Sequence, residues 1–406
     1  MKILFLTDNF PPEVNAPATR TFEHCREWVK QGAEVTVVTC YPNFPQGKVY
    51  EGYKNKFFKK EERIEGVRVI RVWTYITANE GFIKRTLDYL SFAFSSFWAS
   101  LFIKTDVIVA TSPQFFTTFS GYLLSVLKSK PWIFELRDLW PESIRSLTPL
   151  SSHWSLDLLE KIELFLYRKS NRVVAVTEAF KVNLMERGID GDKIEVVTNG
   201  SNLSLFNPSV SGQEVRMRHS LQGKFVVSYI GTHGLAHRLD VFVDNLEKCA
   251  IYTDIHFLFV GTGAEKQRLV DLANKKQLKN ITFMDSVPKD EIVKYWAATD
   301  VSLIPLKKDD TFKTVIPSKM FEAAAMGKPI LLGVEGQAAE IISRYGCGFL
   351  FEPENFSDFF EKLLVLKTSK EQYEVCSEAG FQMARDFDRN LLANKMLHIL
   401  NSVAKK

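Results

Sequence analysis

Short runs of apolar and β-branched residues recur along the chain, at intervals that leave room for a helix between them. In the first half these runs span residues 3–7, 35–39, 67–73, 107–110, 132–136, 173–176 and 194–197. In the second half they span residues 225–230, 255–260, 281–284, 301–304, 330–333 and 349–351. Runs of this length separated by helical spacing are typical of βα units, whose strands pair in parallel. The pattern therefore predicts an α/β protein with two doubly wound domains.

A break in the pattern divides the two sets of strands. Residues 203–223 lose the helical period and collect Pro, Ser and Gly, as linkers do. At 406 residues the chain also exceeds what one hydrophobic core usually serves. We therefore expect an N-terminal domain over residues 1–205 and a C-terminal domain over residues 206–387. A last helix, about 388–406, is expected to pack back onto the N-terminal domain.

Composition excludes several classes of protein. A hydrophobic fraction of 46% and a charged fraction of 25% are ordinary for a globular protein, and a net charge of +4 is too small to indicate nucleic acid as a partner. The five cysteines lie far apart without a CxxC pair, which argues against a zinc site and a disulfide framework. The apolar run in MKILFLTDNF is too short for a secretory signal, so a cytoplasmic protein is expected.

One uncharged segment bears on membranes. Residues 89–103 (YLSFAFSSFWASLFI) fall short of the roughly 18 to 20 apolar residues that span a bilayer, and their length favours a buried helix. However, Lys84, Arg85 and Lys104 flank the run, and the basic segment KNKFFKKEER (54–63) precedes it. Basic residues beside aromatic ones are typical of a surface that binds anionic lipid. A buried helix and peripheral contact with the inner face of the cytoplasmic membrane both stay open.

Polar residues follow two strands of the N-terminal half. The loop after the first strand has no GxGxxG turn, which removes most of the case for NAD or FAD, so no cofactor is expected. This loop offers Asn15 and Ala16 ahead of a helix whose N-terminus suits polar or anionic groups, unless it is a plain helix entry. Four ionisable groups crowd the end of the fifth strand: Glu135, Arg137, Asp138 and Glu142. They indicate either part of the cleft or an ion-pair cluster that pins a loop.

A glycine-rich turn opens the C-terminal half. After its first strand, Gly231 and Gly234 allow the backbone to turn tightly. His233, His237 and Arg238 then place cationic donors near the N-terminus of the next helix, which suits a phosphate. The alternative is a structural turn with incidental histidines.

A lone carboxylate, Glu322, lies in the apolar helical segment MFEAAAM. Pro317 and Ser318 suit the first turn of that helix. Lys319 and Glu322 are three residues apart and therefore lie on the same side of the helix near its N-terminus. There Lys319 would meet a phosphate charge, while Glu322 would accept hydrogen bonds from two hydroxyls, as on a ribose. The apolar neighbours disfavour the alternative, a Lys–Glu pair on a solvated face.

Over essentially its whole length the chain resembles the retaining GT-B glycosyltransferases of glycosyltransferase family 4. The matching segments are EVVTNGSNLSLF (195–206), FVGTG (259–263), ITFMDSVP (281–288) and SKMFEAAAMGKPIL (318–331). Four more segments are similar to bacterial O-antigen and capsule enzymes that transfer N-acetyl-L-fucosamine. These are NFPPEVNAPATR (9–20), YPNFPQGKVYEGY (41–53), ELRDLWPES (135–143) and IGTHGLAHRLD (230–240).

The resemblance implies two Rossmann-like domains facing across a cleft, which is the expected active site. It implies a nucleotide-sugar donor on the second domain and an acceptor on the first. Glu322 matches the glutamate that holds the ribose, residues 231–238 match the diphosphate turn, and Val287 lies in the base-binding loop. Transfer with retention and without a divalent metal is also implied, with cationic side chains stabilising the leaving diphosphate. The family's usual first glutamate is replaced by Thr314, and Arg137 stands where the family has a histidine.

The expected donor-binding residues are Gly231, His233, Gly234, Arg238, Val287, Pro317, Ser318, Lys319 and Glu322. The expected catalytic residues are Arg137, Asp138 and Lys319, and the expected acceptor-side residues are Asn15, Ala16 and Glu135. The predicted enzyme moves an N-acetylated deoxyhexose, N-acetyl-L-fucosamine, from UDP to a polyprenyl-diphosphate-linked saccharide in O-antigen or capsule biosynthesis. The alternatives are a UDP-N-acetylhexosamine 2-epimerase of the same architecture and a non-catalytic subunit that binds a sugar nucleotide.

Overall fold

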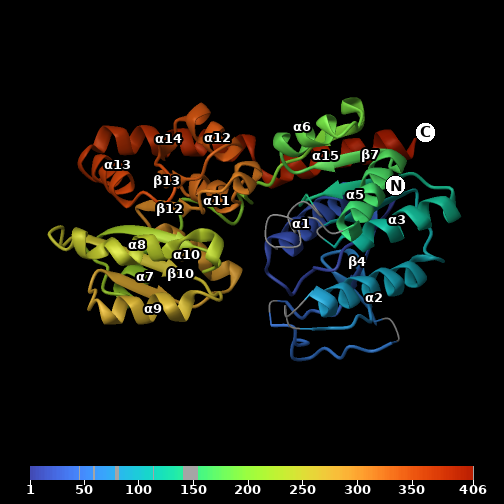
Figure 1. The fold of residues 1–406 in the computed structure, drawn as a ribbon, viewed down its shortest axis with the longest axis horizontal. Helices are drawn as coiled ribbons and strands as arrows, with labels where there is room; N and C mark the ends of the chain where they lie inside the picture. Colours follow the sequence, from blue (N-terminus) through green and yellow to red (C-terminus); the bar gives the residue numbers. More distant parts are fainter. Residues whose placement is uncertain (45, 58–59, 78–81, 113, 140–153, 406) are drawn as a thin grey trace. The chain divides into compact units, whose positions relative to one another are not determined.

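The computed structural model describes residues 1–44, 46–57, 60–77, 82–112, 114–139 and 154–405. The chain forms two compact units (Figure 1). Unit 1 contains Met1–Asn199 together with Arg389–Lys406, and unit 2 contains Gly200–Asp388. Every run predicted as a strand is a strand, with ends that agree to within one residue.

Unit 1 is built on an eight-stranded sheet with the order β3-β4-β2-β1-β5-β6-β7-β8. The strands are β1 (Lys2–Leu6), β2 (Glu34–Cys40), β3 (Lys60–Ile64), β4 (Val67–Val72), β5 (Val107–Thr111), β6 (Trp132–Leu136), β7 (Arg172–Ala175) and β8 (Ile194–Val196). Neighbouring strands are parallel except for β3 and β4. The central strands are buried on both faces, which is why they read as continuous apolar runs.

The edge strand β3 corrects the interpretation of segment 54–63 as a basic surface segment alone, because its last residues pair with β4. Glu65 and Gly66, with φ of 45° and 85°, form the two-residue turn between the strands. The sequence KEERI hides this strand because it alternates little, and charged side chains are how exposed sheet edges avoid pairing with other chains.

Helices cover both faces of the unit 1 sheet. They are α1 (Ala16–Lys30), α2 (Phe82–Ser100), α3 (Phe115–Lys128), α5 (Trp154–Lys169), α6 (Glu178–Glu186) and α15 (Arg389–Ala404), with a 3₁₀ turn η1 (Gly191–Lys193). The core on one face is made with α2, α3, α5 and α6, and the core on the other face with α1 and α15. Helix α1 packs against α15 (Figure 1). The indole Nε1 of Trp28 donates a hydrogen bond to Ala393 O at 2.8 Å.

Unit 2 is built on a six-stranded parallel sheet with the order β11-β10-β9-β12-β13-β14. The strands are β9 (Phe225–Ile230), β10 (Ile255–Val260), β11 (Ile281–Met284), β12 (Val301–Pro305), β13 (Ile330–Gly333) and β14 (Gly348–Leu350). The α-helices are α7 (Gln213–Arg218), α8 (Leu239–Asn245), α9 (Lys266–Lys275), α10 (Lys289–Ala298), α11 (Lys319–Ala325), α12 (Gln337–Tyr345), α13 (Phe356–Thr368) and α14 (Lys370–Asp386). The 3₁₀ turns are η2 (Leu235–His237), η3 (Leu246–Cys249) and η4 (Asp310–Thr314). One core packs with α8, α9 and α13, and the other with α10, α11, α12 and α14.

The chain leaves unit 1 after β8 and returns to it at α15, and α1 holds both segments. Arg20 of α1 donates to Val197 O at 2.8 Å and to Thr198 O at 2.5 Å. Glu23, one turn later, forms an ion pair with Arg389 at the start of α15. Two side chains of one helix therefore fix the last residues before unit 2 and the first residue after it.

Candidate functional site

The loops after β9 and β10 interlock at the carboxyl end of the unit 2 sheet. Gly231 N donates to Val260 O, and His233 N donates to Thr262 O, both at 2.9 Å. Gly261 and Gly263 have φ of 146° and 156°, and a Cβ at either position would collide with the backbone of the loop after β9. These glycines are therefore required for two loops to share one narrow space.

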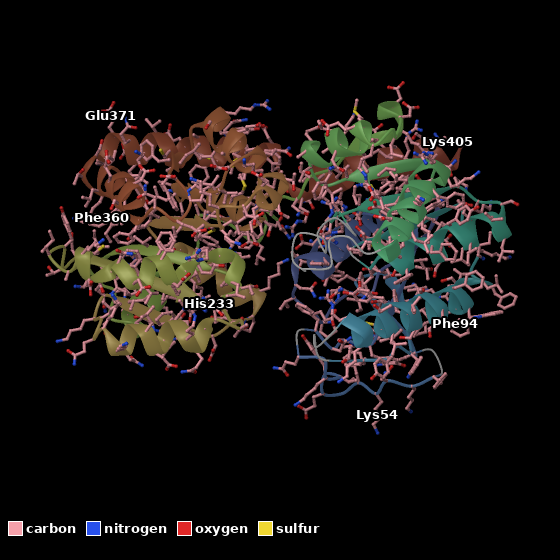
Figure 2. All side chains as sticks on the ribbon, in the orientation of Figure 1. Lys54, Phe94, His233, Phe360, Glu371 and Lys405 are labelled. Atoms are coloured by element: carbon pink, nitrogen blue, oxygen red, sulfur yellow. The ribbon has the colours of Figure 1, made fainter. Side chains whose placement is uncertain are left out.

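The two histidines of the first loop are neutral, which corrects the expectation of cationic imidazoles. His233 is fully buried inside unit 2 and lies against the rings of Tyr229, Phe259 and Phe283 (Figure 2). Burial lowers its pKa to about 4 and that of His237 to about 3, with nearby lysine charges acting in the same direction. Neither ring nitrogen of His233 has a hydrogen-bond partner among the described residues. The imidazole can therefore offer an N–H, but no charge, to a ligand at neutral pH.

Arg238 also differs from its expected place as a phosphate donor at a helix N-terminus. The turn first forms η2, which Gly234 caps, and α8 begins only at Leu239. The Arg238 guanidinium forms ion pairs with Asp240, at 3.1 Å, and with Glu354. Two carboxylates therefore already compensate this charge in the structure.

Lys319 is the cation that faces the glycine turn. Its Nζ lies 3.8 Å from the centroid of the Tyr229 ring, and a Cβ on Gly231 would lie only 2.6 Å from it. The ammonium is buried and has no hydrogen-bond partner among the described residues. Burial lowers the Lys319 pKa to about 7, and the negative charge of Glu322 opposes this shift. The glycine turn thus faces a desolvated ammonium group. Among the described residues, no hydrogen-bonded group compensates its charge.

Helix α11 presents both members of the predicted pair. It begins at Lys319 with Ser318 as the N-cap, so Pro317 precedes the helix instead of lying in its first turn. Buried neighbours on both sides keep α11 against the core, and the buried Lys319 ammonium contradicts a Lys–Glu pair on a solvated face. The indole Nε1 of Trp296 donates to Glu322 Oε2 at 3.3 Å, which orients the half-buried carboxylate.

The loop after β11 is more exposed than the glycine turn. Asp285 is exposed and pairs with Lys266 at 2.5 Å, while the Thr262 and Ser286 hydroxyl oxygens lie 3.2 Å apart. Val287 is half-buried and packs against the hydrophobic core. The predicted donor-binding residues of unit 2 thus come from the loops after β9 and β11 and from the start of α11.

In unit 1 two of the predicted site residues, Glu135 and Arg137, are held by contacts within the unit. Glu135 is fully buried, and one of its oxygens forms an ion pair with Arg20 at 3.2 Å, while the other has no hydrogen-bond partner among the described residues. Arg137 is held by Ser112 Oγ at its backbone N–H and donates to Pro17 O at 3.2 Å. Burial lowers the Arg137 pKa to about 10, so the guanidinium stays charged at neutral pH.

Three further predicted residues of unit 1 lie near the same strand ends. Asp138 is half-buried directly after β6, whereas Glu142 lies outside the described residues. Ala16 is the first residue of α1, and the Asn15 side chain caps that helix by accepting from Ala18 N at 2.8 Å. Its amide nitrogen donates to Asn9 Oδ1 at 2.6 Å. The plain helix entry is therefore what the structure shows for Asn15.

Sequence reasoning missed Asp8 and Asn9, which lie in the loop directly after β1. Burial is the main cause that raises the Asp8 pKa to about 7, and the Glu13 charge adds to the shift. The signal was present, because both residues follow an apolar strand at the carboxyl end of a parallel sheet.

Two family models match the chain. The model described as "Glycosyl transferase 4-like domain" matches residues 15–200, and the model described as "Glycosyl transferases group 1" matches residues 213–383. The chain is therefore a glycosyltransferase, with an N-terminal part that matches the 4-like domain and a C-terminal part that matches group 1. The relative named "Putative colanic acid biosynthesis glycosyl transferase WcaI" from Escherichia coli (strain K12) is 25% identical to it over 370 residues, which are 87% of this chain and 89% of the relative.

Solved structures share the fold of the chain. Sucrose-phosphate synthase from Thermosynechococcus elongatus superposes with a TM-score of 0.80 at 14% identity, over 99% of this chain and 98% of that one. HepE from Anabaena, in complex with UDP and glucose, gives a TM-score of 0.73 at 16% identity, over 99% of this chain and 100% of that one. The predicted GT-B fold with two Rossmann-like α/β domains is confirmed, and the chain is a glycosyltransferase.

Proposed function

We propose that this glycosyltransferase moves an N-acetylated deoxyhexose, N-acetyl-L-fucosamine, from a UDP-sugar to a polyprenyl-diphosphate-linked saccharide. Unit 2 would bind the donor and unit 1 the acceptor, with retention of configuration and without a divalent metal, in O-antigen or capsule biosynthesis in the cytoplasm. The relative named for colanic acid biosynthesis supports a bacterial surface polysaccharide as the product. HepE, whose solved complex contains UDP, supports UDP as the nucleotide.

The observation that carries the donor assignment is the buried Lys319 ammonium beside Gly231. An ammonium that lacks a hydrogen-bond partner in a desolvated place is costly unless an anion joins it. A diphosphate in the glycine turn would supply that anion and accept backbone N–H bonds from the same loop. The proposed roles of Lys319 and of the turn are therefore to bind the diphosphate and to stabilise its charge as it leaves.

The proposal is tested by incubating the protein with UDP-N-acetyl-L-fucosamine and a synthetic polyprenyl-diphosphate-linked saccharide. We expect release of UDP together with a new glycoside whose anomeric configuration, measured by NMR, matches that of the donor. Release of UDP without a new glycoside, or a donor that changes configuration at C2 without an acceptor, would contradict the transferase assignment.

Glu322→Ala is expected to weaken UDP binding by about 1.5 to 3 kcal/mol, the usual loss for hydrogen bonds to a charged group. The reason is the proposed contact of the Glu322 carboxylate with the two ribose hydroxyls. Titration calorimetry with UDP measures the effect, and Glu340→Ala on the exposed face of α12 serves as the matched control. Equal UDP affinity in the two variants would remove Glu322 from the ribose site.

The outer face of α2 supports the proposed peripheral contact with a membrane. The inner face of the helix is buried, whereas exposed side chains recur on the outer face at helical spacing: Leu87, Leu90, Phe94 and Trp98, followed by Phe102. Phe94 is 66% exposed, Trp98 54% and Phe102 89%. Among the residues described, no helix has the length and apolar character needed to cross a bilayer. The uncharged segment, for which the sequence allowed both a buried helix and membrane contact, is thus buried on one face and exposed on the other.

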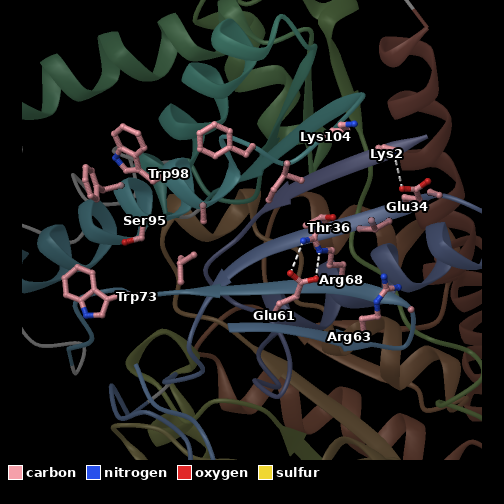
Figure 3. Close-up of a pocket in the computed structure, with 18 of the residues that line it drawn as sticks. Lys2, Glu34, Thr36, Glu61, Arg63, Arg68, Trp73, Ser95, Trp98 and Lys104 are labelled. Carbon is pink, nitrogen blue, oxygen red and sulfur yellow. Dashed lines mark hydrogen bonds and ion pairs between the residues drawn. The ribbon is translucent and has the colours of Figure 1, made fainter. Parts of the chain in front are cut away.

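A groove of about 1370 Å³ adjoins this face. Figure 3 shows Trp98 and Trp73 on one side of it, and Arg63 and the Arg68–Glu61 ion pair on the other. Exposed Lys84 and Arg85 lie in the first turn of α2, and exposed Lys104 follows the helix. Aromatic side chains beside cationic ones match the interface of a bilayer that contains anionic lipid, which is the one occupant we propose for this surface.

Replacing Phe94, Trp98 and Phe102 together by serine is expected to weaken binding to vesicles that contain phosphatidylglycerol by about 1,000-fold or more. Each of these side chains is worth about 1.5 kcal/mol or more when it is buried in an apolar phase. Vesicle sedimentation measures the partition coefficient. The control variant carries Met217→Ser, Val365→Ser and Val375→Ser, three exposed apolar positions of unit 2. Equal binding by the two triple variants would contradict membrane contact through α2.

A further inference from the structure

Unit 1 contains a second, smaller cavity of about 240 Å³ at the carboxyl ends of β1, β2 and β4. Its walls come from the loops after these strands, from the first half of α2 and from the start of α3. The side chains used in the argument are Asp8, Asn9, Asp88, Tyr89, Phe92 and Gln114. Asn15, which the sequence predicts on the acceptor side, also lines this cavity, whereas the other predicted site residues do not.

Gln114 shows that the cavity is built for a polar ligand. Its side chain is more than nine-tenths buried, at 6% exposure. The amide nitrogen donates to the Asp8 carboxylate, while the amide oxygen is buried and has no hydrogen-bond partner among the described residues. A buried carbonyl oxygen is normally paired, so this one calls for a donor from a ligand.

Two carboxylates line the same cavity and are themselves held in place. Asp8 accepts from Asn9 Nδ2 at 2.6 Å and from the Gln114 amide, and Asp88 accepts from Thr74 Oγ1 at 2.9 Å. A third carboxylate, Glu13, accepts from the backbone N–H groups of Asn43 and Phe44, which fixes the loop after β2. Asp8 and Asp88 therefore present oriented acceptors instead of mobile charges.

The rest of the lining selects among ligands that carry hydrogen-bond donors. Tyr89, Phe92 and Phe44 add aromatic surface, and Arg85 adds one positive charge beside Asp88. Aromatic rings together with a few fixed polar groups suit a ring that has an apolar face and several hydroxyls. Pockets for drug-sized molecules measure about 300 to 1,000 Å³, so a cavity of this volume fits a single ring.

We propose that this cavity binds one sugar ring of the acceptor saccharide, with its hydroxyls donating to Asp8, Asp88 and the Gln114 amide oxygen. The inference rests on the proposed transferase function and names the part of unit 1 that holds the acceptor. Of the acceptor-side residues expected from sequence, Asn15 lines this cavity while its side chain caps α1, and Ala16 and Glu135 do not line it.

The test uses methyl glycosides of glucose, galactose and N-acetylglucosamine as probes, without any donor present. Saturation-transfer NMR is expected to show at least one of them bound to the wild-type protein. Gln114→Leu and Asp88→Asn should each weaken that binding at least fivefold, whereas Asp157→Asn on the exposed part of α5 should not. UDP affinity, measured by calorimetry, should be the same in all four proteins, and their circular dichroism spectra should coincide, which shows that the variants are folded.

Two outcomes would overturn the inference. These are no binding of any probe to the wild-type protein, and binding by both cavity variants that equals binding by the wild type. Because glycoside binding needs no donor and no turnover, it separates this inference from the proposed transfer reaction. A protein that binds the glycosides but fails to transfer sugar from UDP-N-acetyl-L-fucosamine would contradict the proposed function and leave the cavity assignment supported.

Discussion

Replacing Lys319 by methionine is expected to lower turnover by about 100- to 1,000-fold, the loss typical of removing one preorganised donor from a developing negative charge. The Lys319 ammonium lies beside Gly231 with no hydrogen-bond partner among the described residues, so its absence leaves the leaving diphosphate without this cation. The measurement is kcat at saturating UDP-sugar and acceptor. Lys328→Met is the control, because Lys328 is another lysine of unit 2 whose pKa burial lowers.

In the Lys319→Met variant the free energy of unfolding should not fall, although turnover does. Burial lowers the Lys319 pKa to about 7 in the folded chain, from 10.5. Between these values the unfolded chain binds more protons than the folded one. The lysine therefore makes the wild-type free energy of unfolding rise with pH. Below about pH 7 the buried lysine lowers this free energy by its full amount. Methionine removes this cost, so the variant should be at least as stable as the wild type at about pH 7. An inactive variant that is also markedly less stable would indicate a structural role for Lys319 instead.

Trp28→Ala is expected to lower the free energy of unfolding of unit 1 by about 3 to 5 kcal/mol. The Trp28 side chain is fully buried between the sheet and α15, and its indole N–H bonds to Ala393 O. The variant therefore loses apolar packing and the hydrogen bond between α1 and α15. Urea denaturation followed by circular dichroism measures the change.

Trp98→Ala provides a matched control for this prediction. Trp98 is 54% exposed on the outer face of α2, and exposed substitutions usually change stability by less than about 0.5 kcal/mol. The same residue type thus tests burial alone. If the two alanine variants unfolded at the same urea concentration, α15 would contribute little to the stability of unit 1.

The hydrophobic pattern predicted the strands well for a physical reason. Parallel strands buried on both faces must be apolar along their whole length, so their ends are legible in the sequence. β3 was missed because it is an edge strand, which pairs on one side only. Such strands carry charged side chains that oppose pairing with other chains, and KEERI has this composition. Whether α2 is buried on one face or on both could not be predicted either. An uncharged run of 15 residues is compatible with both cases.

The candidate site was predictable where it depended on local spacing. Lys319 and Glu322 were placed near the start of one helix because three residues make about one turn, and the structure has them there. The charge state of His233 depends on Tyr229, Phe259 and Phe283, which come from neighbouring strands and loops. Arg238 is compensated by Glu354, far along the sequence. Partners of this kind are set by tertiary packing, which residue spacing does not encode.

The place of α15 has a consequence for how the protein is made. The helix that completes the core of unit 1 is encoded after the whole of unit 2, residues Gly200–Asp388. At roughly 5 to 20 residues per second, a ribosome takes about 10 to 40 seconds to translate that stretch. During this time the face of the first sheet that carries α1, and the Trp28 indole, have no α15 to pack against in the nascent chain. Premature termination anywhere before residue 389 would therefore damage the half of the protein that was synthesised first.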